Sequence, residues 1–116
     1  KIKSKKKFKV EGTGKETRSF CYIDDAIDAT ITIKNKQRQQ FDIYNIGTDI
    51  ETKISDLVKM LNKTLGKNKV PIFKEIANAG TSRRLPDIKK LKKIGFKPKI
   101  SLEEGLRLVS DWHSTN

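Results

Sequence analysis

The sequence predicts an α/β fold built from mixed short strands and about four helices. Short stretches of strand-forming residues, bounded by glycine, proline or polar residues, alternate with stretches whose apolar residues recur at helical spacing. The resulting order, β, β, α, β, α, β, α, α, is typical of a mixed or partly parallel sheet. With 116 residues, the chain has the length of a single domain.

The N-terminal part is expected to form two strands and a helix. Residues 8–10 alternate apolar and charged side chains and run into Gly12-Thr13-Gly14, which predicts a strand that ends in a tight turn. A second extended run covers residues 17–23, after which Asp24 or Asp25 can cap a helix. The apolar positions of this helix, expected roughly on one side, are Ala26, Ile27, Ala29, Ile31 and Ile33.

The middle of the chain is expected to hold a strand, a helix and another strand. Residues 41–46 are rich in strand formers and lie between a polar run and Gly47, which predicts a buried strand. Residues 70–76 predict a further short strand, with Pro71 at its start or on a sheet edge. Between these strands, a helix that Gly66 can end carries one apolar stripe, made of Ile54, Leu57, Val58, Leu61 and Leu65.

The C-terminal part is expected to form a loop and two helices. Residues 77–86 show no periodicity, which predicts a loop carrying Arg83 and Arg84. Asp87 can cap a short helix that Gly95 ends. Ser101 and Glu104 form a capping box that opens the final helix. The apolar face of that helix comprises Leu102, Leu106, Val109 and either Trp112 or His113.

The charge composition is strongly basic, with 26 Lys and Arg against 14 Asp and Glu and a net charge of +12. Six of the first nine residues are lysines, which could form a basic arm on an acidic partner. One alternative function is therefore a stand-alone basic module that binds nucleic acid or another polyanion through the lysines of residues 1–9. Elsewhere the lysines are scattered, and residues 1–9 lack the interleaved aromatic residues that single-strand binders use for stacking, so nucleic acid is not the preferred partner.

Cysteine and histidine usage predicts neither a disulfide nor a metal site. Cys21 is the only cysteine and His113 the only histidine, so no internal disulfide and no Cys/His zinc site can be assembled.

No apolar run approaches the ~18 residues of a membrane span, and no secretory signal is apparent. We therefore expect a cytoplasmic protein without a membrane partner.

The residues predict no catalytic constellation. A dinucleotide fingerprint beginning at Gly12 would need a glycine at position 17, where Thr17 stands. Cys21 lies in an apolar, strand-like context that favours a buried filler. Asp24 and Asp25 are adjacent and would point in different directions, whereas paired acid/base carboxylates must converge on one bond.

Arginine is rare in this lysine-rich chain, and three arginines stand out by their positions. Arg18 lies between two strand-forming stretches, and Arg83 and Arg84 lie in an irregular segment. Guanidinium groups are planar, bidentate donors suited to phosphate or carboxylate, so these arginines could jointly bind a diphosphate. The alternative is that each is an ordinary surface charge.

Several segments occur in the order of a known family. They are G-T-G-K-E-T-R-S-F-C-Y-I-D-D at residues 12–25, Y-N-I-G at 44–47, R-R-L-P-D-I-K-K at 83–90, G-F-K-P at 95–98, and L-E-E-G-L at 102–106 followed by Trp112. Together these segments resemble the C-terminal part of the extended short-chain dehydrogenase/reductase family, the NAD-dependent nucleotide-sugar epimerases, 4,6-dehydratases and decarboxylases. The resemblance implies that residues 1–116 are one segment, the C-terminal substrate-binding part of an extended Rossmann-type enzyme.

The resemblance also implies substrate-binding roles for five residues. Arg18 and Arg84 match the two arginines that approach the nucleotide diphosphate, and Asn45 matches a position that often hydrogen-bonds the substrate. Lys9 and Glu11 match residues that line the base and ribose, although the family frequently has an aromatic residue where Glu11 stands.

The catalytic and cofactor-binding motifs of the family lie upstream of the matched stretch. None of the glycine-rich NAD fingerprint, the catalytic Ser/Thr or the Y-x-x-x-K pair occurs in these residues. The resemblance therefore implies that an upstream Rossmann part binds NAD, that the parent enzyme is a homodimer acting on a nucleotide diphosphate-sugar, and that this chain alone is inactive. A third possibility is a folded fragment that has no ligand.

Overall fold

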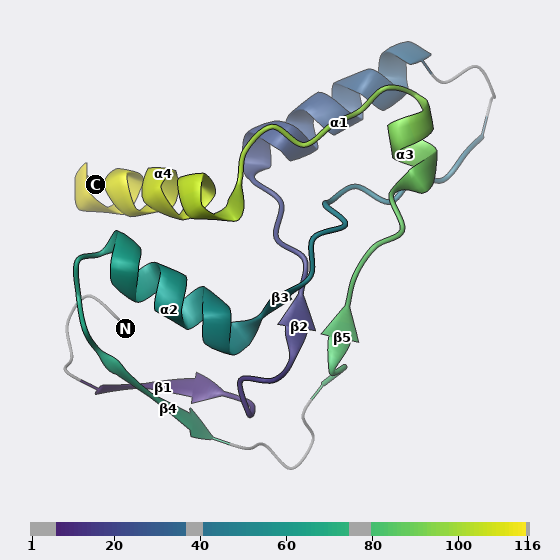
Figure 1. The fold of residues 1–116 in the computed structure, drawn as a ribbon. Helices are drawn as coiled ribbons and strands as arrows, with labels where there is room; N and C mark the ends of the chain where they lie inside the picture. The colour runs from purple at the N-terminus through teal and green to yellow at the C-terminus, as the bar shows by residue number, and fades with distance from the viewer. Residues whose placement is uncertain (1–6, 37–40, 75–79, 116) are drawn as a thin grey trace.

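Figure 1 shows the computed structural model of the chain, which describes residues 7–36, 41–74 and 80–115. The order of elements is β1 (Lys7–Glu11), β2 (Thr17–Arg18), α1 (Ile23–Lys36), β3 (Thr52–Lys53), α2 (Ile54–Thr64), β4 (Val70–Lys74), β5 (Arg83–Arg84), α3 (Lys89–Lys93) and α4 (Leu102–Thr115). Helices α1 and α3 lie at one end of the molecule, while α2, α4 and the β1–β4 pair lie at the other (Figure 1). The predicted α/β class with four helices and short strands is confirmed.

The strands form two small sheets. Strands β1 and β4 pair in parallel, with Phe8 opposite Pro71, so the proline lies on a two-stranded edge. The strand predicted at residues 8–10 is confirmed, and the one predicted at residues 70–76 is confirmed over 70–74, while 75 and 76 lie outside the described part. The second sheet has the order β3-β2-β5, in which β2 is antiparallel to β3 and parallel to β5. This mixed sheet lies between the two ends of the molecule (Figure 1).

The apolar residues of helix α1 lie on two opposite sides of the helix. The prediction that they share one side is therefore wrong. Ala29 is buried and Ile33 packs against the core. Ile23, Ile27 and Ile31, which repeat every four residues on the other side of the helix, are at least half-exposed. The helix itself is confirmed.

Asp25 is a buried anchor and not a helix cap, so the predicted capping role is wrong for this residue. Helix α1 already begins at Ile23, which places Asp25 in its first turn. The Asp25 side chain is 2% exposed, and its two carboxylate oxygens accept the backbone N–H groups of Lys99 and Ile100, each at 3.0 Å. The carboxylate therefore ties α1 to the segment between α3 and α4.

Residues 41–46 do not form the predicted buried strand. Phe41 and Ile43 are 86% and 85% exposed, and no strand of the described chain pairs with this segment. Lys90 holds it against α3 instead: its Nζ donates to the Asp42 carboxylate and to the Ile43 carbonyl, and it lies 4.7 Å from the centre of the Tyr44 ring. The strand between α1 and α2 is β3, which begins six residues further on.

The predicted loop at residues 77–86 is also corrected, at Arg83 and Arg84, which form β5. The N–H of Thr17 donates to the carbonyl of Ser82 at 2.9 Å, and the N–H of Ser19 donates to that of Arg84 at 3.1 Å. A two-residue strand is too short to leave a pattern in the sequence, so β2 decides its conformation. Residues 75–79 lie outside the described part.

The ends of the later helices follow the local signals. Gly66 and Gly95, which follow α2 and α3, have φ of +58° and +96°, conformations that favour glycine. The Asp87 carboxylate accepts the Lys89 N–H at 2.9 Å, and the Ser101 hydroxyl accepts the Glu104 N–H at 3.2 Å. The predicted α2, α3 and α4 are thus confirmed, with the glycine ends of α2 and α3 and the Ser101 cap of α4. The N-cap of α3 is Ile88, so Asp87 bonds to the first turn from one residue before the predicted cap position.

The main core is small and the molecule is thin. Ala29, Ile88, Leu91 and Phe96 form one buried cluster at the α1–α3 end. The Cα radius of gyration is 16.8 Å and the principal extents are 52 × 37 × 19 Å, whereas a compact chain of this length has a radius of about 13 Å. The fold therefore leaves much apolar surface uncovered. Among the helices of the described residues, none has the length and apolar character to cross a membrane.

Gly14 to Ala is expected to destabilise the fold by more than Gly66 to Ala. Both glycines have positive φ, which costs an alanine about 1 kcal/mol. At Gly14 an added Cβ would also lie 2.6 Å from the Phe73 ring, whereas at Gly66 nothing lies within 4 Å. We expect losses of about 3 and 1 kcal/mol respectively, measured by urea denaturation. Equal losses would show that the Phe73 ring moves aside freely.

Candidate functional site

The three-stranded sheet brings Arg18 and Arg84 side by side. They are register partners on the parallel strands β2 and β5. Paired residues of neighbouring strands project on the same face, with backbones about 4.8 Å apart. Arg18 is half-buried and Arg84 is exposed. Two arginine residues from segments 66 positions apart in the sequence thus belong to the same face of the sheet.

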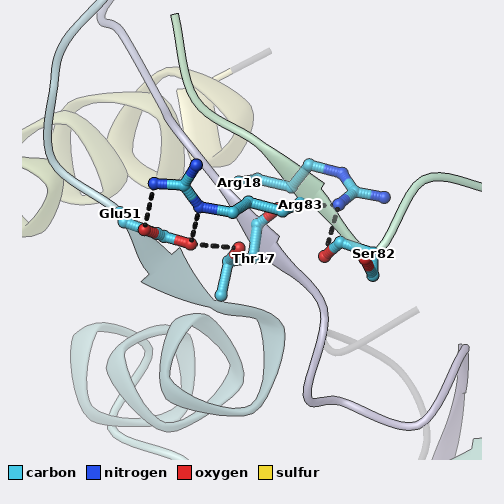
Figure 2. Close-up of polar contacts among 5 residues, drawn as sticks. All are labelled: Thr17, Arg18, Glu51, Ser82 and Arg83. Atoms are coloured by element: carbon cyan, nitrogen blue, oxygen red, sulfur yellow. Dashed lines mark hydrogen bonds and ion pairs between the residues drawn. The ribbon is translucent and has the colours of Figure 1, made fainter.

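Arg18 is held by backbone carbonyls. Its Nη1 donates to the Thr17 carbonyl at 2.7 Å and to the Ser82 carbonyl at 3.4 Å (Figure 2). Both bonds come from one nitrogen, so within the described residues Nε and Nη2 remain for a ligand. Arg84 forms no ion pair with a carboxylate of residues 7–36, 41–74 or 80–115. Its Nη2 lies 3.8 Å from the position that a Cβ on Gly80 would take.

The opposite face of the sheet carries a polar network of Thr17, Glu51 and Arg83, called the Glu51 network below. Arg83 donates to the Glu51 carboxylate from Nε at 2.9 Å and from Nη2 at 3.1 Å, and the Thr17 hydroxyl donates to it at 2.6 Å (Figure 2). The hydrogen bond from Arg83 lowers the pKa of Glu51, and the carboxylate raises that of Arg83. Of the two adjacent arginines, Arg83 is therefore bound to Glu51, and Arg84 is the one available to a ligand.

Sequence reasoning missed Glu51. Glu51 belongs to no motif. The only feature that could have pointed to it is its position as an acidic residue shortly before a predicted helix. The pairing of Glu51 with Arg83, 32 positions away, depends on the strand order β3-β2-β5.

Glu16 fills the predicted turn at Gly12-Thr13-Gly14. Its carboxylate accepts the backbone N–H groups of Thr13 and Gly14, both at 2.9 Å, and the Thr13 hydroxyl at 3.0 Å. These hydrogen bonds lower the pKa of Glu16 to about 2. The turn joins β1 to β2, as predicted, and its N–H groups point at a carboxylate of the chain itself.

The other three predicted substrate residues do not join the arginine pair. Lys9 and Glu11 are exposed on β1, in the other sheet, opposite Ile72 and Lys74. The Asn45 side chain donates to the carbonyl of Asp87 at 3.1 Å and so fastens its loop to the start of α3. Of the five residues, the fold places Arg18 and Arg84 together and the rest elsewhere.

Cys21 and the acidic residues show no further site. Cys21 is half-buried, burial raises the pKa of its thiol, and Sγ donates to the Tyr22 carbonyl at 3.5 Å. Within the part of the chain that the structure describes, no three His, Cys, Asp or Glu side chains gather around a point that could hold a metal ion.

Comparisons with known proteins identify relatives of the chain. A family model described as "NAD dependent epimerase/dehydratase family" matches residues 1–47. A putative GDP-L-fucose synthase from Arabidopsis thaliana is 32% identical over 107 residues, which are 92% of this chain and 32% of that protein.

Solved structures of nucleotide-sugar epimerases and dehydratases are also similar to this chain. The crystal structure of UDP-glucose 4-epimerase with UDP-glucose, from Thermotoga maritima, superposes with a TM-score of 0.83 at 29% identity and covers 94% of this chain and 35% of that one. That of dTDP-glucose 4,6-dehydratase in complex with NAD, from Bacillus anthracis, has a TM-score of 0.83 at 25% identity and covers 95% and 35%. The chain, which spans about a third of the length of these proteins, is therefore a relative of the NAD-dependent nucleotide-sugar epimerases and dehydratases, as its motifs predicted.

Proposed function

We propose that this chain is the substrate-binding part of an NAD-dependent nucleotide-sugar epimerase or dehydratase and binds the substrate diphosphate between Arg18 and Arg84. The observation that carries the proposal is the register of β2 and β5, in which Arg18 and Arg84 are directly paired residues of neighbouring strands. Each group can form a bidentate, charge-assisted contact with one phosphoryl group. A sheet spacing of about 4.8 Å suits two adjacent phosphoryl groups of one ligand.

The names of the relatives support a diphosphate as the recognised part. They act on GDP-, UDP- or dTDP-linked sugars, which differ in base and sugar and share the nucleoside diphosphate. A pair of arginines recognises the charge and geometry of phosphoryl groups and does not contact the base, so this pair fits the diphosphate that these ligands share. These names differ in base, sugar and reaction, so they assign none of the three to this chain.

We assign NAD binding to a part of the enzyme other than residues 1–116. The GxG turn does not fit a pyrophosphate, because its N–H groups donate to Glu16, whose negative charge would repel the ligand. NAD, where bound, supplies the hydride acceptor. The residues of this chain would hold and orient the substrate diphosphate, and the proton-transfer groups would come with the NAD-binding part.

The exposed apolar residues support a second part of the enzyme as a neighbour. Ile23, Ile27 and Ile31 form an uncovered stripe on α1, and Val109 and Trp112 are exposed on α4. The thin shape of the molecule and its coverage of only a third of its relatives are consistent with surfaces that pack against the NAD-binding part.

Arg84→Ala is expected to raise the KM for the nucleotide-sugar substrate by about 10- to 150-fold, the effect of losing a charge-assisted hydrogen-bonded pair. The measurement is steady-state kinetics on the enzyme that joins this chain to its NAD-binding part. Arg107→Ala is the matched control, because Arg107 is an exposed arginine on α4 that pairs with Asp111 at 3.2 Å. If KM is the same for Arg84→Ala, Arg107→Ala and the parent, the diphosphate role of Arg84 is wrong.

A further inference from the structure

We infer that Glu51 and Arg83 are positioning residues of the diphosphate site, which hold β5 in the register that places Arg84 opposite Arg18. The inference rests on the proposed function and adds two residues that do not touch the ligand. Its observation is the Glu51 network, which Figure 2 shows. Thr17 and Arg83 are register partners that alternate with Arg18 and Arg84 along β2 and β5, so the network belongs to the opposite face of the sheet.

Strand β5 has few other attachments. It is two residues long and, among the described strands, pairs only with β2. The Arg18 side chain adds a bond of 3.4 Å to the Ser82 carbonyl. A strand of two residues forms few backbone hydrogen bonds, each of which adds only about 1 kcal/mol, so a side-chain contact that crosses the sheet has a large share in fixing its place.

The Glu51 carboxylate spans all three strands. Glu51 immediately precedes β3, Thr17 lies on the central strand β2, and Arg83 lies on β5. The fork of Arg83 reaches across β2 to the carboxylate, and the Thr17 hydroxyl donates to the same group. A bidentate contact fixes direction as well as distance, so it aligns β5 along β2.

The sequence of β5 makes this alignment necessary. Arg83 and Arg84 are identical, so a slip of one residue would place Arg83 opposite Arg18 and turn Arg84 to the other face. After such a slip Glu51 would meet Ser82 in place of Arg83, and the two-bond contact would be lost. The two adjacent arginines alone would fit either register. The contact with Glu51 forms only in the native one and therefore favours it.

The exposure of the pair favours a local role. The side chains of Arg83 and Glu51 are 61% and 33% exposed, and exposed ion pairs contribute little to global stability. Breaking the pair should therefore leave the fold intact and loosen β5, which appears in substrate binding and not in unfolding.

The test uses Glu51→Gln in the same joined enzyme, alone and combined with Arg84→Ala. Glu51→Gln is expected to raise the KM for the nucleotide-sugar about 5-fold and to leave kcat within about 2-fold, as expected for a weakened exposed pair that acts on binding. In the Arg84→Ala background it should have no further effect, because Glu51 acts through Arg84. Arg83→Lys keeps the positive charge and loses the bidentate contact, so it should give a KM between those of the parent and Glu51→Gln. It replaces Glu51→Gln as the test if that variant does not fold.

The control is Lys63→Gln, which breaks another exposed pair, with Glu103 at 2.8 Å, and should leave KM unchanged. The inference is overturned if Arg84→Ala raises KM and Glu51→Gln does not, or if their effects multiply in the double variant. An unchanged KM for Arg84→Ala overturns the proposed function instead, so the two failures are distinct.

Discussion

Replacing Asp25 with Asn is expected to lower the free energy of unfolding by about 3 kcal/mol, the cost of disrupting charge-assisted hydrogen bonds at a buried group. The two Asp25 oxygens each accept a backbone N–H at 3.0 Å. An asparagine side chain keeps one acceptor and turns an NH₂ group toward the other N–H. One backbone donor is then left unpaired in a place that water does not reach, since Asp25 is 2% exposed.

The neighbouring carboxylate provides the control. Asp24 lies in the same helical turn and is exposed, so Asp24→Asn should change the unfolding free energy by less than about 0.5 kcal/mol. Urea denaturation of the 116-residue chain, followed by far-ultraviolet circular dichroism, measures both. Similar midpoints for the two variants would mean that the contact with residues 99 and 100 adds nothing to stability.

Leu91→Ala is expected to destabilise the chain by about 3 kcal/mol, within the range for leucine-to-alanine changes in protein cores. Leu91 is fully buried on α3 and belongs to the main cluster with Ala29, Ile88 and Phe96. Because this cluster is small, few side chains can move to fill the space that the leucine leaves. The same denaturation experiment measures the loss.

Ile43→Ala is the matched control for Leu91→Ala, since it removes the same number of carbon atoms from a side chain that is 85% exposed. Its expected effect is below about 0.5 kcal/mol. A loss at Leu91 as small as that at Ile43 would show that the α1–α3 cluster is not the main core of the protein.

Local signals in the sequence were sufficient for most elements. The apolar stripe of α2, the glycines after α2 and α3, and the Ser101 cap of α4 each act within a few residues, so they operate before any tertiary contact forms. The motif order also predicted the family relation and singled out Arg18 and Arg84. The sequence alone did not show that these two arginines lie on one face.

Segments that depend on a partner were not predictable. Residues 41–46 have strand composition, but a strand needs a neighbour for its backbone hydrogen bonds, and the described chain supplies none. Conversely, Arg83 and Arg84 have no strand pattern and become β5 because β2 offers free N–H and C=O groups beside them.

The sequence by itself therefore determined the four helices, the glycine ends of α2 and α3, the Ser101 start of α4 and the α/β class, because these depend on spacing along the chain. It also singled out Arg18 and Arg84 as candidate ligands of a diphosphate. The tertiary structure alone decided the burial of Asp25, the pairing of Arg18 with Arg84 and the network of Glu51 with Arg83. Each of these joins groups more than 30 positions apart, and their contact depends on the strand order and on the packing of α1 against the segment before α4. Short-range pattern carries no information about such contacts.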